Sequence, residues 1–291
     1  MRYRLTLTIR YDFDRPTGAA RQVLRICPAD LLGVQQVMSC RVTIQPAPLE
    51  RREFTDFFGT RSIELALPAG LTALRFDMTA EGTRLAPVEA PDLSAPVSAL
   101  ADEIAGHTDL GAGSPQHFLA PSPRIPAVPA IAAFAAGATA GAASTRAAVQ
   151  ALGRALHDRL AFDATTTEVD TPVADAFAGC SGVCQDFSQI MICGLRSLGI
   201  PAAYVSGFLR TLPPPGQPRL QGADAMHAWV RAWTGARGGW VDYDPTNACF
   251  AGQDHVVIGH GRDYADAAPV IGALRLDGAQ SGSHSVDLEE I

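Results

Sequence analysis

The sequence predicts an α+β fold in which an N-terminal β-sandwich precedes a core of helices followed by strands. Short alternating apolar and polar segments, separated by Pro, Gly and Asp turns, fill the first part of the chain. Helical periodicity begins near residue 145, and strand patterns return after residue 201. Of the 291 residues 47% are hydrophobic and 18% charged, a composition typical of a folded protein with a sizeable core.

The same patterns divide the chain into four parts. Residues 1–88 carry the turn spacing of a β-sandwich domain, and residues 89–145 are rich in Ala, Pro, Ser and Gly, as in a linker with accessory helices. Residues 146–275 are predicted to form the α+β core, in which a Pro-rich loop over 211–224 separates two strands. Residues 276–291 are predicted to be a C-terminal tail or edge strand.

Charge and hydropathy exclude several classes of partner. The net charge is −7, all 23 basic residues are arginine, and no basic run is present, so we expect no nucleic-acid partner. No window approaches the roughly 18 apolar residues of a membrane span, so we expect no membrane partner. The first residues alternate between apolar and polar side chains, as in a strand, and lack the continuous apolar run of a signal peptide. We therefore expect a cytoplasmic protein, in which the cysteines are free thiols rather than disulfides. The oligomeric state is left open.

Three of the six cysteines lie close together, at Cys180, Cys184 and Cys193, and a metal site is the first interpretation to weigh. Cys180 and Cys184 have a spacing found in structural zinc sites, but no second close pair follows. Cys193 would lie on the opposite face of a helix from Cys184. Downstream histidines include His227, His255 and His260. We predict no metal and no cofactor.

A helix is predicted over 183–197, with an apolar stripe along one face and Gly199 at its C-terminal end. Cys184 falls in its first turn, where unpaired amide groups and the helix dipole stabilise a thiolate. We therefore predict that Cys184 is a nucleophile rather than a buried core thiol. Four other cysteines lack this context and are predicted to be packing residues: Cys27, Cys40, Cys193 and Cys249.

A base and an orienting carboxylate follow from a predicted hairpin. The segments "MHAWVRAW" and "WVDYDP" flank the turn "TGARGG". If Trp233 pairs with Trp240, His227 and Asp244 lie diagonally on one face of the sheet and within side-chain reach. A shift of one residue would separate them. The alternatives are an ordinary half-buried histidine and a turn-forming aspartate before Pro245.

The segments "GVCQDFS", "LGIPAAYVSGF", "HAWV", "WVDYDPTN" and "GRDYADAAPVIG", in that order, resemble the transglutaminase-like superfamily in its bacterial branch with an N-terminal β domain. The resemblance implies a papain-like α+β core with Cys184 as nucleophile, His227 as base and Asp244 as orienting carboxylate. The segment "DFFGTRS" matches a turn of the family's β domain.

The chain also departs from the family pattern. Ala203 and Phe208 stand where members often carry Arg and Tyr, which implies a less polar substrate cleft. Asp186 is interpreted as a helix-start residue rather than a catalytic one. The charged residues of the last segment are expected to brace the core: Arg262, Asp263 and Asp266.

These residues predict attack of a thiolate on an amide carbonyl and a thioester acyl-enzyme. Resolution by water would give a peptidase or amidase that acts on a peptide or protein substrate, and we favour this because no donor site for a lysine amine is visible. Resolution by an amine would give a protein-glutamine transglutaminase. A catalytically idle peptide-binding module, or a subunit that presents its cleft to one dedicated peptide, also remains open.

Overall fold

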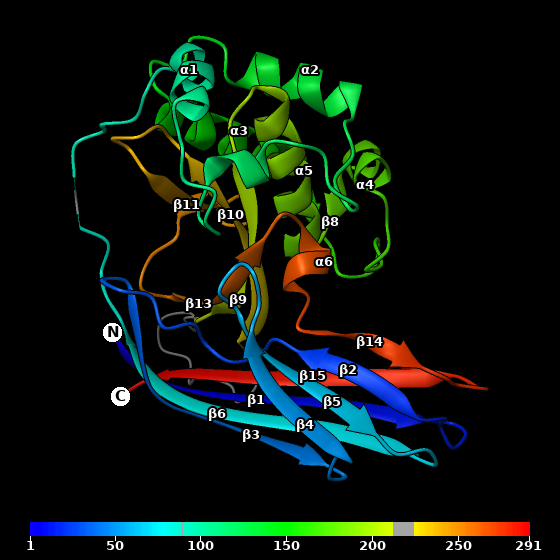
Figure 1. The fold of residues 1–291 in the computed structure, drawn as a ribbon. Helices are drawn as coiled ribbons and strands as arrows, with labels where there is room; N and C mark the ends of the chain where they lie inside the picture. Colours follow the sequence, from blue (N-terminus) through cyan, green and yellow to red (C-terminus); the bar gives the residue numbers. More distant parts are fainter. Residues whose placement is uncertain (89, 212–223) are drawn as a thin grey trace, which may run out of the picture.

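The computed structural model describes residues 1–88, 90–211 and 224–291. Figure 1 shows helices gathered at one end of the molecule, strands of a β domain at the other end, and a further sheet that runs between them. The Pro-rich loop predicted over 211–224 lies outside the described residues except for its two end positions. None of the helices in the described part of the chain is long and apolar enough to cross a bilayer.

The β domain consists of two four-stranded antiparallel sheets, as the predicted sandwich requires. The first has the order β15 (Gln280–Glu290), β1 (Arg2–Phe13), β6 (Ala73–Arg84) and β3 (Gln35–Gln45). The second has the order β14 (Val270–Leu274), β2 (Ala20–Leu24), β5 (Arg61–Leu67) and β4 (Glu50–Thr55). Alternate residues of β1, from Tyr3 to Ile9, are buried between the sheets, which explains the alternation seen in the sequence.

The C-terminal part of the chain returns to the β domain. Strand β14 pairs with β2, and β15 pairs with β1 along its whole length. The predicted limit of the core at residue 275 therefore differs from the structure, in which the return begins at Val270. Residues 280–290 form an edge strand of the first sheet. A local pattern could not reveal the earlier return, because β14 is defined by a partner strand far away in the sequence.

The core combines helices with a five-stranded antiparallel sheet. The helical segments are η1 (Val97–Ala99), α1 (Leu100–Ala105), η2 (Pro115–Phe118), α2 (Pro129–Ala138), α3 (Thr145–Arg159), α4 (Val173–Gly179), α5 (Cys184–Ser197) and α6 (Tyr264–Ala267). The sheet has the order β12 (Cys249–Phe250), β11 (Trp240–Asp244), β10 (Ala225–Trp233), β9 (Ala202–Leu209) and β13 (His255–Gly261). A short parallel pair joins β7 (Ala161–Phe162) to β8 (Ser181–Gly182).

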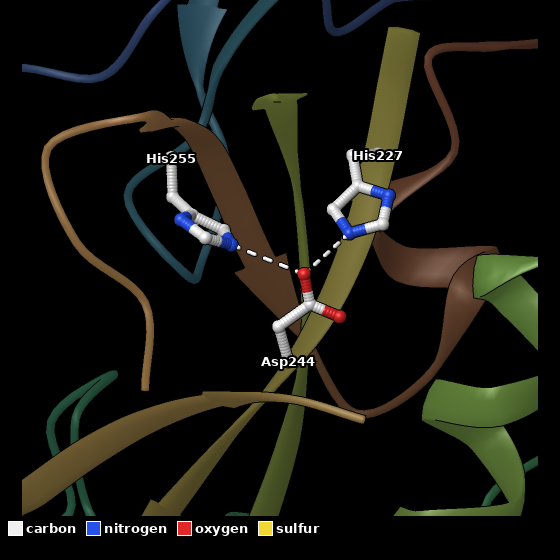
Figure 2. Close-up of side chains that lie close together, drawn as sticks. All are labelled: His227, Asp244 and His255. Atoms are coloured by element: carbon white, nitrogen blue, oxygen red, sulfur yellow. Dashed lines mark hydrogen bonds and ion pairs between the residues drawn. The ribbon is translucent and has the colours of Figure 1, made fainter. Parts of the chain in front are cut away.

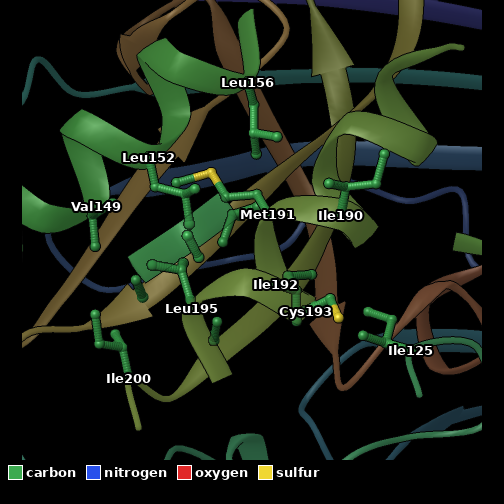
Figure 3. Close-up of a cluster of buried hydrophobic side chains, with 14 of the residues drawn as sticks. Ile125, Val149, Leu152, Leu156, Ile190, Met191, Ile192, Cys193, Leu195 and Ile200 are labelled. Carbon is green, nitrogen blue, oxygen red and sulfur yellow. The ribbon is translucent and has the colours of Figure 1, made fainter. Parts of the chain in front are cut away.

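Helix α5 is the central element of this core. It contacts α2, α3 and α4 as well as strands β9 and β10, and Figure 3 shows its apolar side chains meeting those of α3. Its end matches the prediction, because Gly199 has a positive φ of 76°. The predicted apolar stripe on one face underestimates how much of the helix is buried, since every residue from 185 to 196 is buried. At Gly194 a side chain would come within 3.1 Å of both Ala135 and Leu152.

A hairpin between β4 and β5 ties the β domain to the core. Asp56 shapes its turn by accepting from the amide of Thr60 at 2.9 Å, and its carboxylate pairs with Arg25 at 3.2 Å. The ring of Phe58 then packs against Phe118 and His260 of the core. This hairpin is the "DFFGTRS" segment of the sequence.

Candidate active site

Cys184 is the first residue of α5, and Val183 alone separates it from the end of β8. The helix start is fixed by Asp186, whose Oδ2 accepts from the amide of Val183 at 2.8 Å and from the hydroxyl of Thr167 at 2.7 Å. Asp186 is thus the helix-start residue that the sequence indicated. The amides of Asp186 and Phe187 donate to the carbonyl of Val183. The amides of Cys184 and Gln185 precede the first intrahelical bond, so they are the helix-start donors nearest the Cys184 sulfur. Cys184 itself is only partly buried.

The hairpin of β10 and β11 has the predicted register, with Trp233 opposite Trp240 and Val230 opposite Tyr243. This register brings His227 and Asp244 together, and the Nε2 atom of His227 lies 2.7 Å from Oδ2 of Asp244 (Figure 2). Both side chains are buried.

Asp244 is a buried carboxylate whose oxygens accept several hydrogen bonds. Oδ1 accepts from the amides of Thr246 at 2.9 Å and Asn247 at 3.2 Å. Oδ2 accepts from the side chains of Asn247 at 2.7 Å, His227 at 2.7 Å and His255 at 3.1 Å. Burial alone would raise the pKa of Asp244, but the donors, led by His227 and His255, outweigh burial and hold the pKa well below its ordinary value. Asp244 is therefore charged at neutral pH.

His227 is the residue that connects this carboxylate to the cysteine. Burial alone would lower the pKa of His227, but the hydrogen bonds with Asp244 and Cys184 outweigh it and raise the pKa to about 10. Because Nε2 is bound to Asp244, Nδ1 is the nitrogen left for Cys184. The predicted trio of Cys184, His227 and Asp244 is therefore adjacent in the structure.

Cys184 and His227 open into one cleft of about 380 Å³ between the β domain and the core. The core wall includes Tyr204, Met226 and Tyr264, and the β-domain wall includes Ile9, Tyr11 and His284. No arginine, aspartate or glutamate lines this cleft among the described residues. Ala203 and Phe208 are buried elsewhere on β9 and do not line it, so the inference of a less polar cleft from these two positions was wrong in its cause.

One group of side chains has the composition of a metal site. The nearest nitrogens of His227 and His255 and an oxygen of Asp244 lie within 4.8 Å of one another. Two imidazole nitrogens already share the same carboxylate oxygen at 2.7 and 3.1 Å, so the protons of two hydrogen bonds fill the space in which an ion would have to bind. The geometry is that of a hydrogen-bonded cluster.

The remaining candidate ligands lie apart from this cluster. Cys193 is buried, and its sulfur donates to the carbonyl of Pro126 at 3.3 Å. Cys180 ends α4, where its sulfur contacts the carbonyl of Phe177 at 3.7 Å. His260 packs on Phe58 and Phe118, and burial lowers its pKa to about 4.

The charged residues of the last motif brace the end of the core, as expected. Arg262 pairs with Asp266 at 2.8 Å. Asp263 caps α6 by accepting from the amide of Ala265 and also accepts from the amide of Arg124, both at 2.9 Å. These contacts hold α6, and with it Tyr264, at the rim of the cleft.

Two residues of the site were not found from the sequence. Tyr204 is buried beside Cys184 in the cleft, and its hydroxyl makes no hydrogen bond among the described residues. His255 was considered only as a metal ligand, because its contact with Asp244 depends on where β13 joins the sheet. The strand pattern "YVSGF" could have indicated Tyr204, because the side chains of a strand point alternately to its two faces.

Comparison with known proteins is consistent with this geometry. Residues 3–82 match the bacterial transglutaminase-like N-terminal region, and residues 132–245 match the transglutaminase-like superfamily. An uncharacterized protein of Mycobacterium tuberculosis is 40% identical over 126 residues, which cover 42% of this chain and 40% of that protein. An uncharacterized protein of Mycobacterium leprae is 40% identical over 149 residues, 50% of this chain and 49% of that protein. The matches thus span no more than half the length of either relative.

A solved structure shares the fold over nearly the whole chain. It is a protein of Cytophaga hutchinsonii described as a candidate cysteine protease. It superposes with a TM-score of 0.74 and 22% sequence identity, and the match covers 99% of this chain and 90% of that chain. This likeness supports the observed two-part architecture of a β domain and a core.

Proposed function

Because the chain belongs to the transglutaminase-like superfamily, we propose that it is a cysteine enzyme that cleaves amide bonds of a peptide or protein through a thioester on Cys184. The observation that carries the proposal is the shared cleft. Cys184 and His227 both open into it, and Asp244 holds His227 from behind. A pKa of about 10 keeps His227 protonated at neutral pH, so it can pair with a Cys184 thiolate before substrate binds.

The reaction follows from these positions. The thiolate of Cys184 attacks the amide carbonyl carbon, and the carbonyl oxygen becomes an oxyanion. The backbone amide of Cys184 and the hydroxyl of Tyr204 are the two donors that we assign to this oxyanion. His227 donates its proton to the leaving amine as the carbon–nitrogen bond breaks, which leaves a thioester. The neutral imidazole then accepts a proton from the water that hydrolyses the thioester.

The lining of the cleft favours water over a lysine amine as the second reactant. A lysine ammonium ion would have to lose its hydration, and no carboxylate among the described lining residues could compensate. The aromatic and aliphatic walls instead suit an uncharged substrate segment. A protein-glutamine transglutaminase is the second candidate, and a peptide-binding module without turnover is the third.

Incubation with a diverse peptide library, with and without a primary amine, tests the proposal by mass spectrometry. We expect cleaved or deamidated peptides in both samples and no amine adducts. Amine adducts as the main product would favour the transferase. The Cys184→Ala variant is the negative control, and Cys193→Ala controls for loss of a thiol elsewhere on the same helix. If wild type leaves all peptides unchanged, and if Cys184 is alkylated no faster than an ordinary thiol, the peptide-binding module is the remaining candidate function.

A further inference from the structure

We propose that His255 is a positioning residue for the His227–Asp244 pair and that its neutral imidazole sets how strongly Asp244 holds the proton of His227. The inference rests on the proposed function, because it assigns a role within the same site. Figure 2 shows the two histidines converging on one carboxylate from different strands. His227 comes from β10 and His255 from β13.

The hydrogen bonds of His255 fix its protonation state. Its Nδ1 atom accepts from the amide of Gly252 at 3.2 Å, so this nitrogen carries no proton. Its Nε2 atom lies 3.1 Å from Oδ2 of Asp244, an acceptor, so Nε2 carries the proton. A doubly protonated ring would place an N–H against the Gly252 N–H. His255 is therefore a neutral donor, whereas His227 is the histidine that carries charge.

Packing holds His255 in this orientation. The indole ring of Trp229 lies edge-on to the ring of His255, and their centroids are 5.2 Å apart. The centroid of the Trp229 ring lies 6.3 Å from that of the His227 ring. The backbone carbonyl of His255 accepts from Nε of Arg84 at 2.8 Å, a contact that reaches from β6 of the β domain. His255 thus connects the β domain to the carboxylate behind His227.

The other ionisable groups near this cluster come from several elements. Cys184 of α5 acts on His227, and Asp244 acts on Cys249 of β12. Asp242 lies beyond Trp229, where Arg231 pairs with it at 2.7 Å. Asp244 is therefore the carboxylate that serves both imidazoles, and each donor that it accepts reduces its pull on the others.

Removal of one donor makes the remaining bond stronger. Without His255 the carboxylate becomes more basic, so it stabilises the imidazolium form of His227 further and the pKa of His227 rises. We expect His255→Ala to shift the alkaline limit of the thiolate–imidazolium pair upward by about 0.5 to 1 pH unit. His255→Gln can still donate to Asp244 from its amide, so it should restore the wild-type limit.

The test measures alkylation of Cys184 by iodoacetate against pH in the full chain, with each modified cysteine identified by peptide mass. The carboxylate of this reagent is attracted by the imidazolium, so the rate falls when His227 loses its proton. We expect the fall to come at higher pH in His255→Ala and at the wild-type pH in His255→Gln. His107→Ala, far from the cleft, is the matched control and should behave as wild type.

The outcomes separate this inference from the proposed function. If wild type shows accelerated alkylation of Cys184 with an alkaline fall, and folded His255→Ala shows the same fall at the same pH, the role of His255 is refuted while the enzyme proposal stands. A wild-type profile without any fall would refute the enzyme proposal itself. If His255→Ala does not fold, His255→Leu is measured in its place. A pH profile of His255→Gln that is shifted from that of wild type also contradicts the inference.

Discussion

Helix α5 carries a cysteine at its first position and another in its interior, in opposite environments. Cys184, at the first position, opens into the cleft beside His227, whereas Cys193, nine residues later, is buried. Burial raises the pKa of Cys193, and its sulfur is bound to a backbone carbonyl. We therefore expect the reactivity of a thiol in this helix to depend on its distance from the helix start and on the groups that face it.

Exchange of the two cysteines for alanine is expected to have the largest and most contrasting effects. Cys184→Ala should abolish turnover and cost about 1 kcal/mol or less of stability, because the side chain is only partly buried. Cys193→Ala should retain turnover and cost roughly 1 to 2 kcal/mol, because it leaves a small cavity. Peptide cleavage and urea denaturation measure the two effects. Turnover by Cys184→Ala would remove it as the nucleophile.

Changes at Asp244 should have the next largest effect, since they act on Cys184 through His227 alone. Asp244→Ala removes all of these acceptors, so it should lower the pKa of His227 and slow the alkylation of Cys184 at neutral pH. Asp244→Asn keeps one oxygen as an acceptor, but its new NH₂ group faces the donors that bind the other oxygen. We therefore expect a loss of alkylation rate between those of wild type and Asp244→Ala. Alkylation rates against pH for wild type, Asn and Ala test this order. If wild type and both variants have the same pH profile of alkylation, and the variants differ only by lower melting temperatures, Asp244 only forms a turn.

Tyr204→Phe tests the assigned oxyanion donor. We expect kcat to fall about ten- to a hundredfold with little change in KM, because the hydroxyl contributes only once charge develops on the carbonyl oxygen. Tyr264→Phe, which removes a hydroxyl from the same cleft, is the matched control and should change kcat much less. Equal losses in both variants would argue against a specific role for Tyr204.

The pH dependence of stability tests the same pair of residues without removing either. The pKa of His227 is raised to about 10, so its contribution is complete below the pKa of about 6.5 in the unfolded chain and is lost as pH rises toward 10. Asp244 contributes in the opposite direction, because its lowered pKa stabilises the fold above the unfolded value and less in acid. Urea midpoints of wild type and Cys193→Ala should fall in parallel above neutral pH. A flat midpoint in that range would contradict the raised pKa of His227.

The sequence allowed prediction of features that depend on local periodicity. The helix around Cys184, the Trp233–Trp240 register and the contact of His227 with Asp244 all follow from spacing within a few dozen residues. Features that depend on distant partners could not be predicted. The contact of His255 with Asp244 requires β13 to pair with β9, and the β-domain wall of the cleft requires β15 to pair with β1.

The return of the chain to the β domain also affects the order in which the protein can be assembled on the ribosome. Cys184, His227 and Asp244 are all synthesised before β14 and β15, which supply Val270 and His284 to the opposite wall of the cleft. The N-terminal sheets cannot be completed until these last strands emerge, so this β domain does not fold as a finished unit ahead of the rest. A nascent chain that already holds Cys184 therefore lacks the part of the cleft wall that β14 and β15 supply, so the proposed substrate site is complete only after these strands have paired.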